Sequence, residues 1–336
     1  MINQPAVKIG KRVPAEAPKV SVIIPAYNIA SYIGETLDSI LAQSFKNYEI
    51  ILVNDGSTDT PELETGLAPY FDDIIYAVQE NSGAAQARNA AIHFARGELL
   101  AFLDGDDVWL PDFLESQTHF LKANKYEMVY CDALIFGDAP YENQTFMDGS
   151  PSNGEVTTVS LLTTECNVIT SGTVLKKSLL ETFGTFDVEL RRGQDFDLWF
   201  RLAKNDVRIG YQTEVLLKYR VRPGNLTGTN VDRAARNISV MKRLREKYEL
   251  NEREIEVWKN QFIAFEAELE LEKGKICLAS GDYSNARTHL AAANKFYRKP
   301  KLSLINWLLR LSPALTARLF KTIRPSEFSY ISPNKH

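Results

Sequence analysis

The chain has 336 residues, of which 44% are hydrophobic and 24% charged, and its formal net charge at pH 7 is −4. This composition is typical of globular proteins, and the length suits roughly two domains. The acidic balance argues against nucleic acid as a partner. Three widely spaced cysteines without a CxxC pair exclude a disulfide framework and a zinc site as simple interpretations, and they fit the reducing cytoplasm.

The first segment, residues 1–18, lacks the apolar core of a secretory signal, so we expect it to be a flexible N-terminal arm. No uninterrupted apolar run in the sequence approaches the roughly 20 residues that a membrane-spanning helix needs. We therefore expect a cytoplasmic protein without a membrane span.

Four short runs rich in β-branched residues follow the arm, and each ends in a polar, turn-prone cluster. They are "VSVIIPAYN", "YEIILVNDGSTD", "DIIYAVQENSG" and "ELLAFLDGDD". Helical patterns alternate with these runs: apolar side chains at helical spacing over 33–41, then "AAQARNAAIHFA", then "PDFLESQTHFLKAN", in which Pro111 suits the first helical position. The alternation predicts an α/β fold, with helices on both faces of a parallel sheet.

The second half of the sequence changes character twice. Residues 125–228 are mixed, with expected strands at "MVYCDALIF" and "EVLLKYRV" and a helix at "DFDLWFRLAKN". From about residue 230 long helical patterns dominate, and 268–300 matches one tetratricopeptide-like unit, although we favour an ordinary helical hairpin. We expect a nucleotide-binding domain over 19–228, a mainly helical region over 229–298, and a tail over 299–336.

Carboxylates gather where two of the expected strands end. Asp55 follows "IILV", and Asp104 and Asp106 follow "LLAFL" within the stretch "FLDGDDVW". Ligands of open parallel sheets bind outside the carboxyl ends of the strands. Clustered carboxylates repel one another unless a cation neutralises them, and Mg²⁺ or Mn²⁺ typically takes one or two, completing its shell with water and phosphates. The hypothesis is a metal that holds a diphosphate; the alternative is an Asp-rich turn that caps the following helix.

Five stretches together make this chain resemble the family-two glycosyltransferases, which have the GT-A fold, over about residues 19–225. They are "VSVIIPAYN", "ILVNDGSTD", "NSGAAQARNAAI", "FLDGDDVWLPDFL" and "GQDFDLWFRLA", in the order that the family has them. The resemblance implies a GT-A-like sheet, a nucleotide-sugar donor, expected to be UDP-linked, and transfer to an acceptor hydroxyl. It also implies positions in the donor site: Pro25 and Tyr27 beside the base, Asp55 accepting a hydrogen bond from it, and Arg88 bracing carboxylates or contacting the nucleotide.

The resemblance also assigns the metal and the chemistry. Asp104 would bind the ribose hydroxyls or assist the metal, Asp106 would be the direct ligand of Mg²⁺ or Mn²⁺, and Asp195 would be the catalytic base. One base and direct displacement imply inversion at the anomeric carbon. The sequence departs from the family where Gln194 replaces a carboxylate, and where Arg222 stands near the place of a histidine that can join the metal shell; an arginine could contact a phosphate instead.

The C-terminal tail is basic. From residue 283 to 326 the sequence holds nine Lys and Arg and no Asp or Glu, around the apolar run "LSLINWLLRLSPALTARLF". We expect an amphipathic helix on an anionic membrane surface, peripheral on the inner face of the plasma membrane. The alternative is packing on the catalytic domain or on a second copy in a homo-oligomer.

The acceptor is expected to be a glycan, a lipid-linked molecule or another hydroxyl compound of cell-envelope polysaccharide synthesis. This expectation is an analogy with the family. Two rival functions stay open: a nucleotidyltransferase, and a catalytically silent nucleotide-sugar-binding or scaffold protein.

Overall fold

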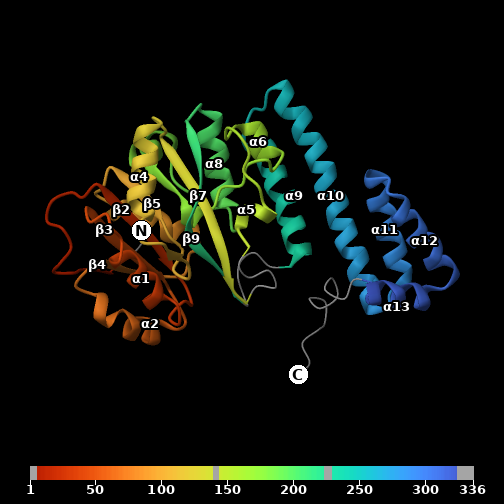
Figure 1. The fold of residues 1–336 in the computed structure, drawn as a ribbon, viewed down its shortest axis with the longest axis horizontal. Coiled ribbons are helices and arrows are strands. Elements are labelled where there is room, and N and C mark those ends of the chain that lie inside the picture. Colours follow the sequence, from red (N-terminus) through yellow and green to blue (C-terminus); the bar gives the residue numbers. More distant parts are fainter. Residues whose placement is uncertain (1–5, 139–143, 223–228, 324–336) are drawn as a thin grey trace. The chain divides into compact units, whose positions relative to one another are not determined.

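The computed structural model describes residues 6–138, 144–222 and 229–323, and the chain divides near residue 225 into two compact units (Figure 1). The first unit contains a nine-stranded sheet in the order β1-β4-β3-β2-β5-β8-β7-β9-β6. The second unit is helical.

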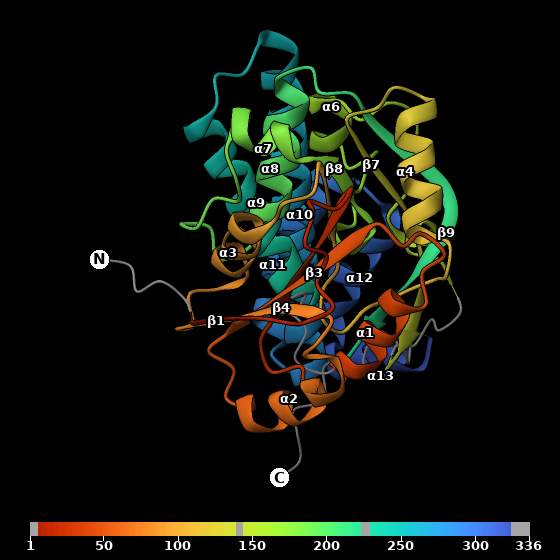
Figure 2. The ribbon, with the colours of Figure 1, turned by 90° about the vertical axis from the view of Figure 1, so that its left-hand side faces the viewer.

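A parallel core of four strands occupies one half of the sheet: β2 (Val20–Ala26), β3 (Tyr48–Asp55), β4 (Ile74–Gln79) and β5 (Leu99–Phe102). The strands are buried almost throughout, as expected for continuous apolar runs covered on both faces. Helix α3 lies on one side of these strands, and α1 lies on the other (Figure 2). The predicted α/β fold is confirmed for this half.

The other half of the sheet is mixed. Strand β8 (Val174–Lys176) runs antiparallel to both β5 and β7 (Met128–Gly137), whereas β9 (Ile209–Val221) is parallel to β7. The two-residue strand β6 (Val108–Trp109) closes the order, antiparallel to β9. The expected strands within 125–228 are therefore present, but the sheet as a whole is not purely parallel.

Part of the segment predicted to be a flexible N-terminal arm is a strand of the sheet. Residues 1–5 lie outside the described part of the chain, but β1 (Ala6–Ile9) is a strand that pairs antiparallel with β4. Without β1 the backbone groups along one edge of β4 would have no strand partner, and the alternating Val7 and Ile9 suit an edge strand. This segment is short and follows no turn signal, so composition alone suggested a flexible arm.

The helices predicted in the first unit occur where expected. They are α1 (Ile33–Leu41), α3 (Ala84–Phe94), α4 (Phe113–Ala123) and α8 (Gln194–Lys204). Helix α4 begins after Asp112, so Pro111 precedes it and does not take its first position. The remaining helical elements are short: α2 (Thr60–Leu67), η1 (Ala68–Tyr70), α5 (Phe146–Gly149), α6 (Thr158–Leu162), η2 (Thr170–Gly172) and α7 (Lys177–Phe183).

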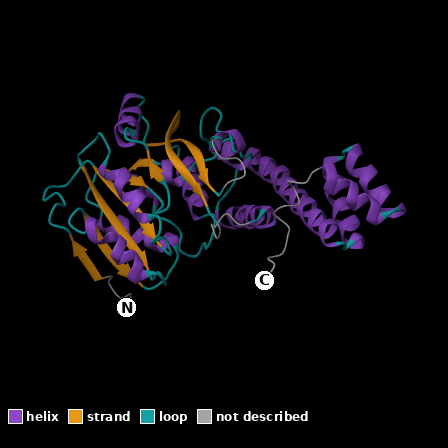
Figure 3. Cartoon of the chain, turned by 60° about the horizontal axis from the view of Figure 1, so that its bottom comes forward, coloured by secondary structure: helices purple, strands orange, loops and turns teal. Residues whose placement is uncertain are grey.

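Helices make up the described part of the second unit (Figure 3). They are α9 (Asn230–Lys247), α10 (Glu252–Ser280), α11 (Tyr283–Tyr297), α12 (Pro300–Leu311) and α13 (Pro313–Ile323). The α10–α11 pair forms the predicted hairpin and approaches closely at Gly274, where a Cβ would lie 2.8 Å from the Leu290 side chain. Of the predicted tail, 299–323 forms the last two helices, and 324–336 lies outside the described residues. No helix in the described ranges is long and apolar enough to cross a bilayer.

Candidate functional site

The predicted site residues of the sheet lie at the carboxyl ends of its parallel strands. Tyr27 directly follows β2, Asp55 is the last residue of β3, and Asp104 comes two residues after β5. Because β2 is parallel to both β3 and β5, these three ends share one edge of the sheet. This is the edge at which open α/β sheets bind ligands.

Tyr27 offers an aromatic ring at this edge. Tyr27 is 45% exposed, although it directly follows a strand that is buried at every residue except Pro25. The next residue, Asn28, adopts a left-handed conformation with φ of 53°, and its side-chain oxygen accepts a hydrogen bond from the Thr58 N–H at 2.9 Å. The loop that carries Tyr27 is therefore tied to the loop after β3, and the ring faces solvent, where a flat ligand can stack. Pro25, within β2, is half-buried.

Asp55 is buried, and its carboxylate already has partners. One oxygen accepts from Gln79 Nε2 at 2.7 Å and from the Ser82 N–H at 2.9 Å, and the other accepts from the Gly83 N–H at 2.8 Å. These bonds fasten the end of β3 to the loop before α3. A carboxylate has about four acceptor positions, so one remains for a donor from a ligand.

Arg88 and Asp104 form an ion pair, as the resemblance implies for an arginine that braces the carboxylates. Arg88 is 6% exposed, its Nη2 donates to Asp104 Oδ1 at 2.5 Å, and its guanidinium lies over the Phe186 ring with the centroid 5.5 Å away. The guanidinium fixes one oxygen of Asp104, whose side chain is about a third exposed. Among the residues that the structure describes, none donates a hydrogen bond to the other oxygen, Oδ2.

Asp106 faces a second arginine. Its Oδ2 accepts from Arg222 Nε at 2.6 Å, and its backbone carbonyl accepts from Arg220 Nε at 2.7 Å. Burial raises the pKa of Asp106, and so does the charge of Asp104, whereas Arg222 lowers it. Arg222 thus supplies the positive charge that the sequence analysis assigned to a metal, and it comes from the end of β9.

Asp107 is a member of the carboxylate group that the sequence analysis did not single out. It is 1% exposed, and its Oδ1 accepts from the Arg220 N–H at 2.8 Å. Burial raises the pKa of Asp107 well above its usual range, and the charges of Asp106 and Asp104 add to the effect. Its role is to join this turn to β9. A Cβ at the adjacent Gly105 would lie 2.2 Å from Ile29 Cδ1, so a larger residue there would require the Ile29 side chain to shift.

The 3₁₀ turn η2 connects the carboxylate turn to Asp195. Ser171 Oγ accepts from the Asp104 N–H at 3.1 Å, and the Ser171 carbonyl accepts from Trp109 Nε1 at 2.8 Å. The neighbouring Thr170 donates its hydroxyl to Asp195 Oδ2 at 3.3 Å. One short turn therefore positions both aspartates. The sequence carried no motif for it, since "TSG" is common in loops.

Asp195 stands in the first turn of α8. It is half-buried, and its Oδ1 accepts from the Phe196 N–H at 2.9 Å. Gln194 beside it is buried and neutral, so it adds no negative charge. Asp197 is buried and its carboxylate lies 3.9 Å from Arg201 Nη1 within the same helix. Of the two aspartates, Asp195 is the more accessible.

The donor set at Asp104 and Asp106 suits a metal that arrives with phosphate. Among the residues that the structure describes, no group of three or more His, Cys, Asp or Glu is placed to hold an ion. Two carboxylates are nevertheless what Mg²⁺ takes from a protein when phosphates and water complete its shell. The residues fit such a shared site, provided that Asp106 turns from Arg222 toward the metal.

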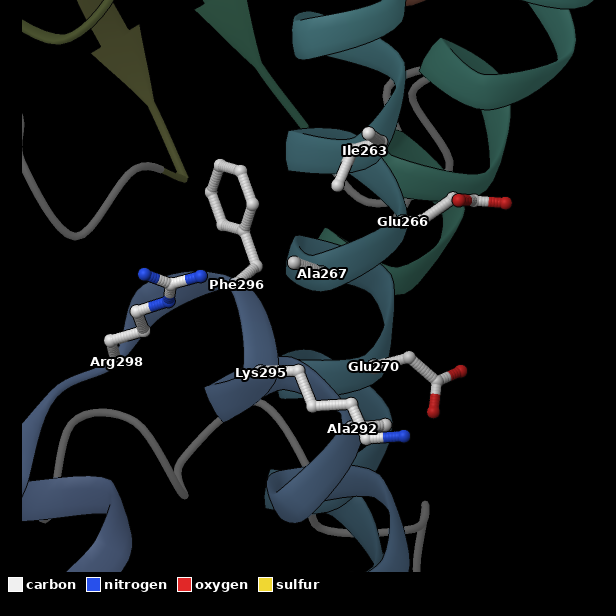
Figure 4. Close-up of a pocket in the computed structure, with 8 residues that line it drawn as sticks. All are labelled: Ile263, Glu266, Ala267, Glu270, Ala292, Lys295, Phe296 and Arg298. Atoms are coloured by element: carbon white, nitrogen blue, oxygen red, sulfur yellow. The ribbon is translucent and has the colours of Figure 1, made fainter.

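A separate groove of about 600 Å³ lies in the helical unit, between α10 and α11 (Figure 4). Ile263 and Phe296 form its apolar part, and Glu266, Glu270, Lys295 and Arg298 bring charges of both signs. None of the site residues predicted from the sequence lines it. Its mixed lining indicates no ligand class.

Comparison with known proteins gives one family. A family model described as Glycosyl transferase family 2 matches residues 21–184. A glycosyltransferase of Rickettsia prowazekii is 37% identical over 216 residues, which are 63% of this chain and 67% of the relative. The Escherichia coli UDP-Glc:alpha-D-GlcNAc-diphosphoundecaprenol beta-1,3-glucosyltransferase WfaP is 30% identical over 227 residues, 66% of this chain and 85% of that enzyme.

Two solved structures share the fold. Staphylococcus aureus TarS 1–349, in complex with UDP-GlcNAc, is 18% identical with a TM-score of 0.58, and the match covers 83% of this chain and 91% of that one. The mannosyltransferase PcManGT of Pyrobaculum calidifontis, in complex with GDP-Man and Mn²⁺, is 19% identical with a TM-score of 0.60 and covers 96% and 88%. At these identities the matches establish the fold.

Proposed function

This chain belongs to glycosyltransferase family 2 and has the GT-A fold, and from that premise we propose that it moves a sugar from a UDP-linked donor to an acceptor hydroxyl, inverting the anomeric carbon. One observation carries the proposal. Asp104, which Arg88 braces, and Asp195 are joined through η2 at the carboxyl edge of the sheet, and Asp106 lies in the same turn as Asp104. This network supports the proposal, because it connects the candidate donor-binding carboxylates with the candidate base.

The nucleotide end of the donor would lie against Tyr27 and Pro25. The exposed ring of Tyr27 can stack on a base, and Asp55 has one acceptor position left for a base N–H. Uracil presents such an N–H, and the E. coli relative is named for a UDP-linked donor. GDP-Man in the Pyrobaculum structure makes guanine the alternative base.

The diphosphate would lie by the carboxylate turn. Asp104 and Asp106 would hold Mg²⁺ or Mn²⁺ there, which as a Lewis acid stabilises the charge that grows on the departing diphosphate. Arg222 would exchange Asp106 for a phosphate oxygen, since a guanidinium suits both partners. Asp104 keeps its contact with Arg88, so the turn stays in place while Arg222 moves.

Asp195 would act as the general base. It takes the proton of the acceptor hydroxyl as the hydroxyl oxygen forms its bond to the anomeric carbon and the bond from that carbon to the diphosphate breaks. Proton removal of this kind contributes typically about 10²–10⁴-fold to the rate. The half-buried position of Asp195 gives access to an acceptor, and the Thr170 hydroxyl holds the carboxylate in orientation.

The acceptor would be a lipid-linked or other glycan of cell-envelope polysaccharide synthesis. The E. coli relative, of which this chain covers 85%, is named for a diphosphoundecaprenol-linked acceptor. An acceptor of that class lies at a membrane, so the proposal includes a cytoplasmic enzyme peripheral to the inner face of the plasma membrane. The alternative acceptor is a glycan that is not attached to a lipid.

Calorimetric titration with UDP-Glc, UDP-GlcNAc and GDP-Man, each with Mn²⁺ and with EDTA, tests the proposal when it is combined with an assay for released nucleoside diphosphate. We expect a UDP-sugar to bind, more tightly with Mn²⁺, and to release UDP. Binding without turnover on any acceptor tried would favour a silent nucleotide-sugar-binding protein. Gln194, in the place of a carboxylate, and the ion pair between Arg222 and Asp106 are the features that support this alternative. Formation of a nucleotide sugar and pyrophosphate would favour a nucleotidyltransferase.

A further inference from the structure

The last two helices carry an exposed apolar stripe. In α12 it consists of Leu304, Trp307 and Leu311, and in α13 of Leu315 and Leu319. Each of these side chains is at least half exposed, between 50% and 64%. The spacing of three and four residues puts the three α12 positions on one side of that helix, and the two α13 positions on one side of the other. We call these five residues the outer stripe.

The outer stripe is not the face that builds the core of the unit. Helix α12 packs inward through Leu309, which is 3% exposed, and through Leu302 and Ile305, which contact a cluster containing Leu278 and Leu290 of α10 and α11. The helix is therefore apolar on two sides, one of which has its protein partner. A helix that is apolar on an outer face as well normally has a second apolar environment.

Cations flank the outer stripe. By helix geometry Lys301 and Arg310 lie on opposite sides of the Leu304–Trp307–Leu311 row, and Arg318 lies one position before Leu319. The sequence from 283 to 326 contains no acidic residue. The charged residues of α12 and α13 are thus all basic.

We propose that the outer stripe inserts into the headgroup region of an anionic bilayer, with Lys301 and Arg310 contacting lipid phosphates. The charge argues for this occupant: an anionic surface complements the flanking cations, whereas the same face of a second copy would bring like charges together. Leucines with a tryptophan between basic residues are also the composition of helices that lie in the membrane plane. This inference deepens the proposed function, because it would hold the enzyme where a lipid-linked acceptor lies.

Sedimentation of the full chain with vesicles tests the inference. Vesicles of phosphatidylcholine alone are compared with vesicles that also contain phosphatidylglycerol, at low and high salt. We expect binding to the anionic vesicles only, weakened by salt, because the Debye length shortens. The variant Leu304→Ser/Trp307→Ser/Leu311→Ser should lower the partition coefficient by about 10²-fold, since it removes the inserted side chains. Its fold should persist, as all three positions are exposed.

Charge reversal provides a matched comparison. Lys301→Glu/Arg310→Glu should weaken binding to anionic vesicles by about 10-fold or more. The control Arg253→Glu/Lys259→Glu makes the same change of net charge at two exposed residues near the start of α10, many turns before Leu278, and should bind almost as the wild type does.

Fluorescence locates the contact. Trp109 and Trp199 are buried and Trp258 is half-buried, whereas Trp307 is 55% exposed. Vesicles should therefore shift the emission to shorter wavelength through Trp307, and Trp307→Phe should lose the shift while keeping most of the binding.

Two results would overturn the inference: no binding of the full chain to anionic vesicles at low salt, or a concentration-dependent dimer that the serine variant abolishes. Release of UDP from the donor in solution does not depend on the stripe. Failure of vesicle binding and failure of the proposed transfer are therefore separate outcomes.

Discussion

The ion pair between Arg88 and Asp104 offers a quantitative test of how the site is held. Arg88 is 6% exposed and Asp104 about a third exposed, so the pair lies between the surface and buried cases. A charge-assisted hydrogen bond contributes about 1.5–3 kcal/mol, and breaking a fully buried pair costs about 3–5 kcal/mol. Allowing for the exposure of Asp104, we expect Asp104→Ala to lower the free energy of unfolding by about 2 kcal/mol.

Replacing the arginine should cost less than replacing the aspartate. Arg88 Nε is buried and has no hydrogen-bond partner among the described residues, so Arg88→Met removes an unsatisfied donor together with the ion pair. Methionine can still contact Phe186. We expect Arg88→Met to lower the free energy of unfolding by about 1 kcal/mol. If both substitutions remove the same contact, the double variant should have nearly the same free energy of unfolding as Asp104→Ala alone. The coupling energy between the two positions would then be about 1 kcal/mol.

Urea unfolding of the wild type, both single variants and the double variant gives this coupling, and calorimetry with UDP and Mn²⁺ on the same proteins gives the effect on the donor. Arg88→Met should weaken UDP binding, because Asp104 loses its orientation. Arg12→Met is the matched control: Arg12 pairs with Asp73 at the exposed surface, at 2.6 Å, and should leave UDP binding unchanged. Additive losses of stability, with a coupling below about 0.3 kcal/mol, would refute the reasoning.

Three further predictions address other contacts. Arg222→Gln should weaken UDP binding in EDTA by about 10-fold, because a charged phosphate contact is lost; unchanged affinity in calorimetry would contradict the exchange proposed for Arg222. Thr170→Val should lower transfer several-fold and shift its pH profile while leaving UDP affinity unchanged, if Thr170 is a positioning residue for Asp195; an unaltered profile would contradict this. Burial raises the pKa of Glu270, but hydrogen bonds from His289 and Lys273 outweigh it and lower that pKa overall. Because the pKa of Glu270 is lower in the folded protein than the unfolded value of about 4.3, the ionised carboxylate stabilises the fold above that value, and this stabilisation is lost as the pH falls through the folded pKa. The difference in the free energy of unfolding between the wild type and His289→Ala should therefore vanish in acid. A difference that does not change with pH would contradict this prediction.

The sequence predicted the parallel half of the sheet because its buried strands are continuous β-branched runs between helical patterns. It did not predict β1, since a four-residue edge strand gains its stability from pairing with β4 and carries little local signal. In the mixed half of the sheet the sequence predicted β7 and β9 but not β8, because β8 is short and is held by pairing with β5 and β7, which are distant in the sequence.

The residues of the candidate site also divide into those that the sequence predicted and those that it did not. Asp104, Asp106 and Asp195 were found because they lie in motifs, and their roles stay predictions. Ser171 and Thr170 were missed because a hydrogen bond across the sheet leaves no periodic pattern. Arg222 was noticed as a departure from the family, but that its guanidinium contacts Asp106 follows only from the course of β9.

The most direct test of the account is donor binding and sugar transfer measured on one preparation of Asp195→Asn beside the wild type. Asparagine keeps the shape of the side chain and can still accept from Thr170, but it cannot take a proton. We predict unchanged affinity for the UDP-sugar and transfer lowered by about 10²-fold or more, a barrier increase of about 3 kcal/mol. Intact binding with wild-type transfer would contradict the assignment and move the base elsewhere, with Asp197 as the next candidate.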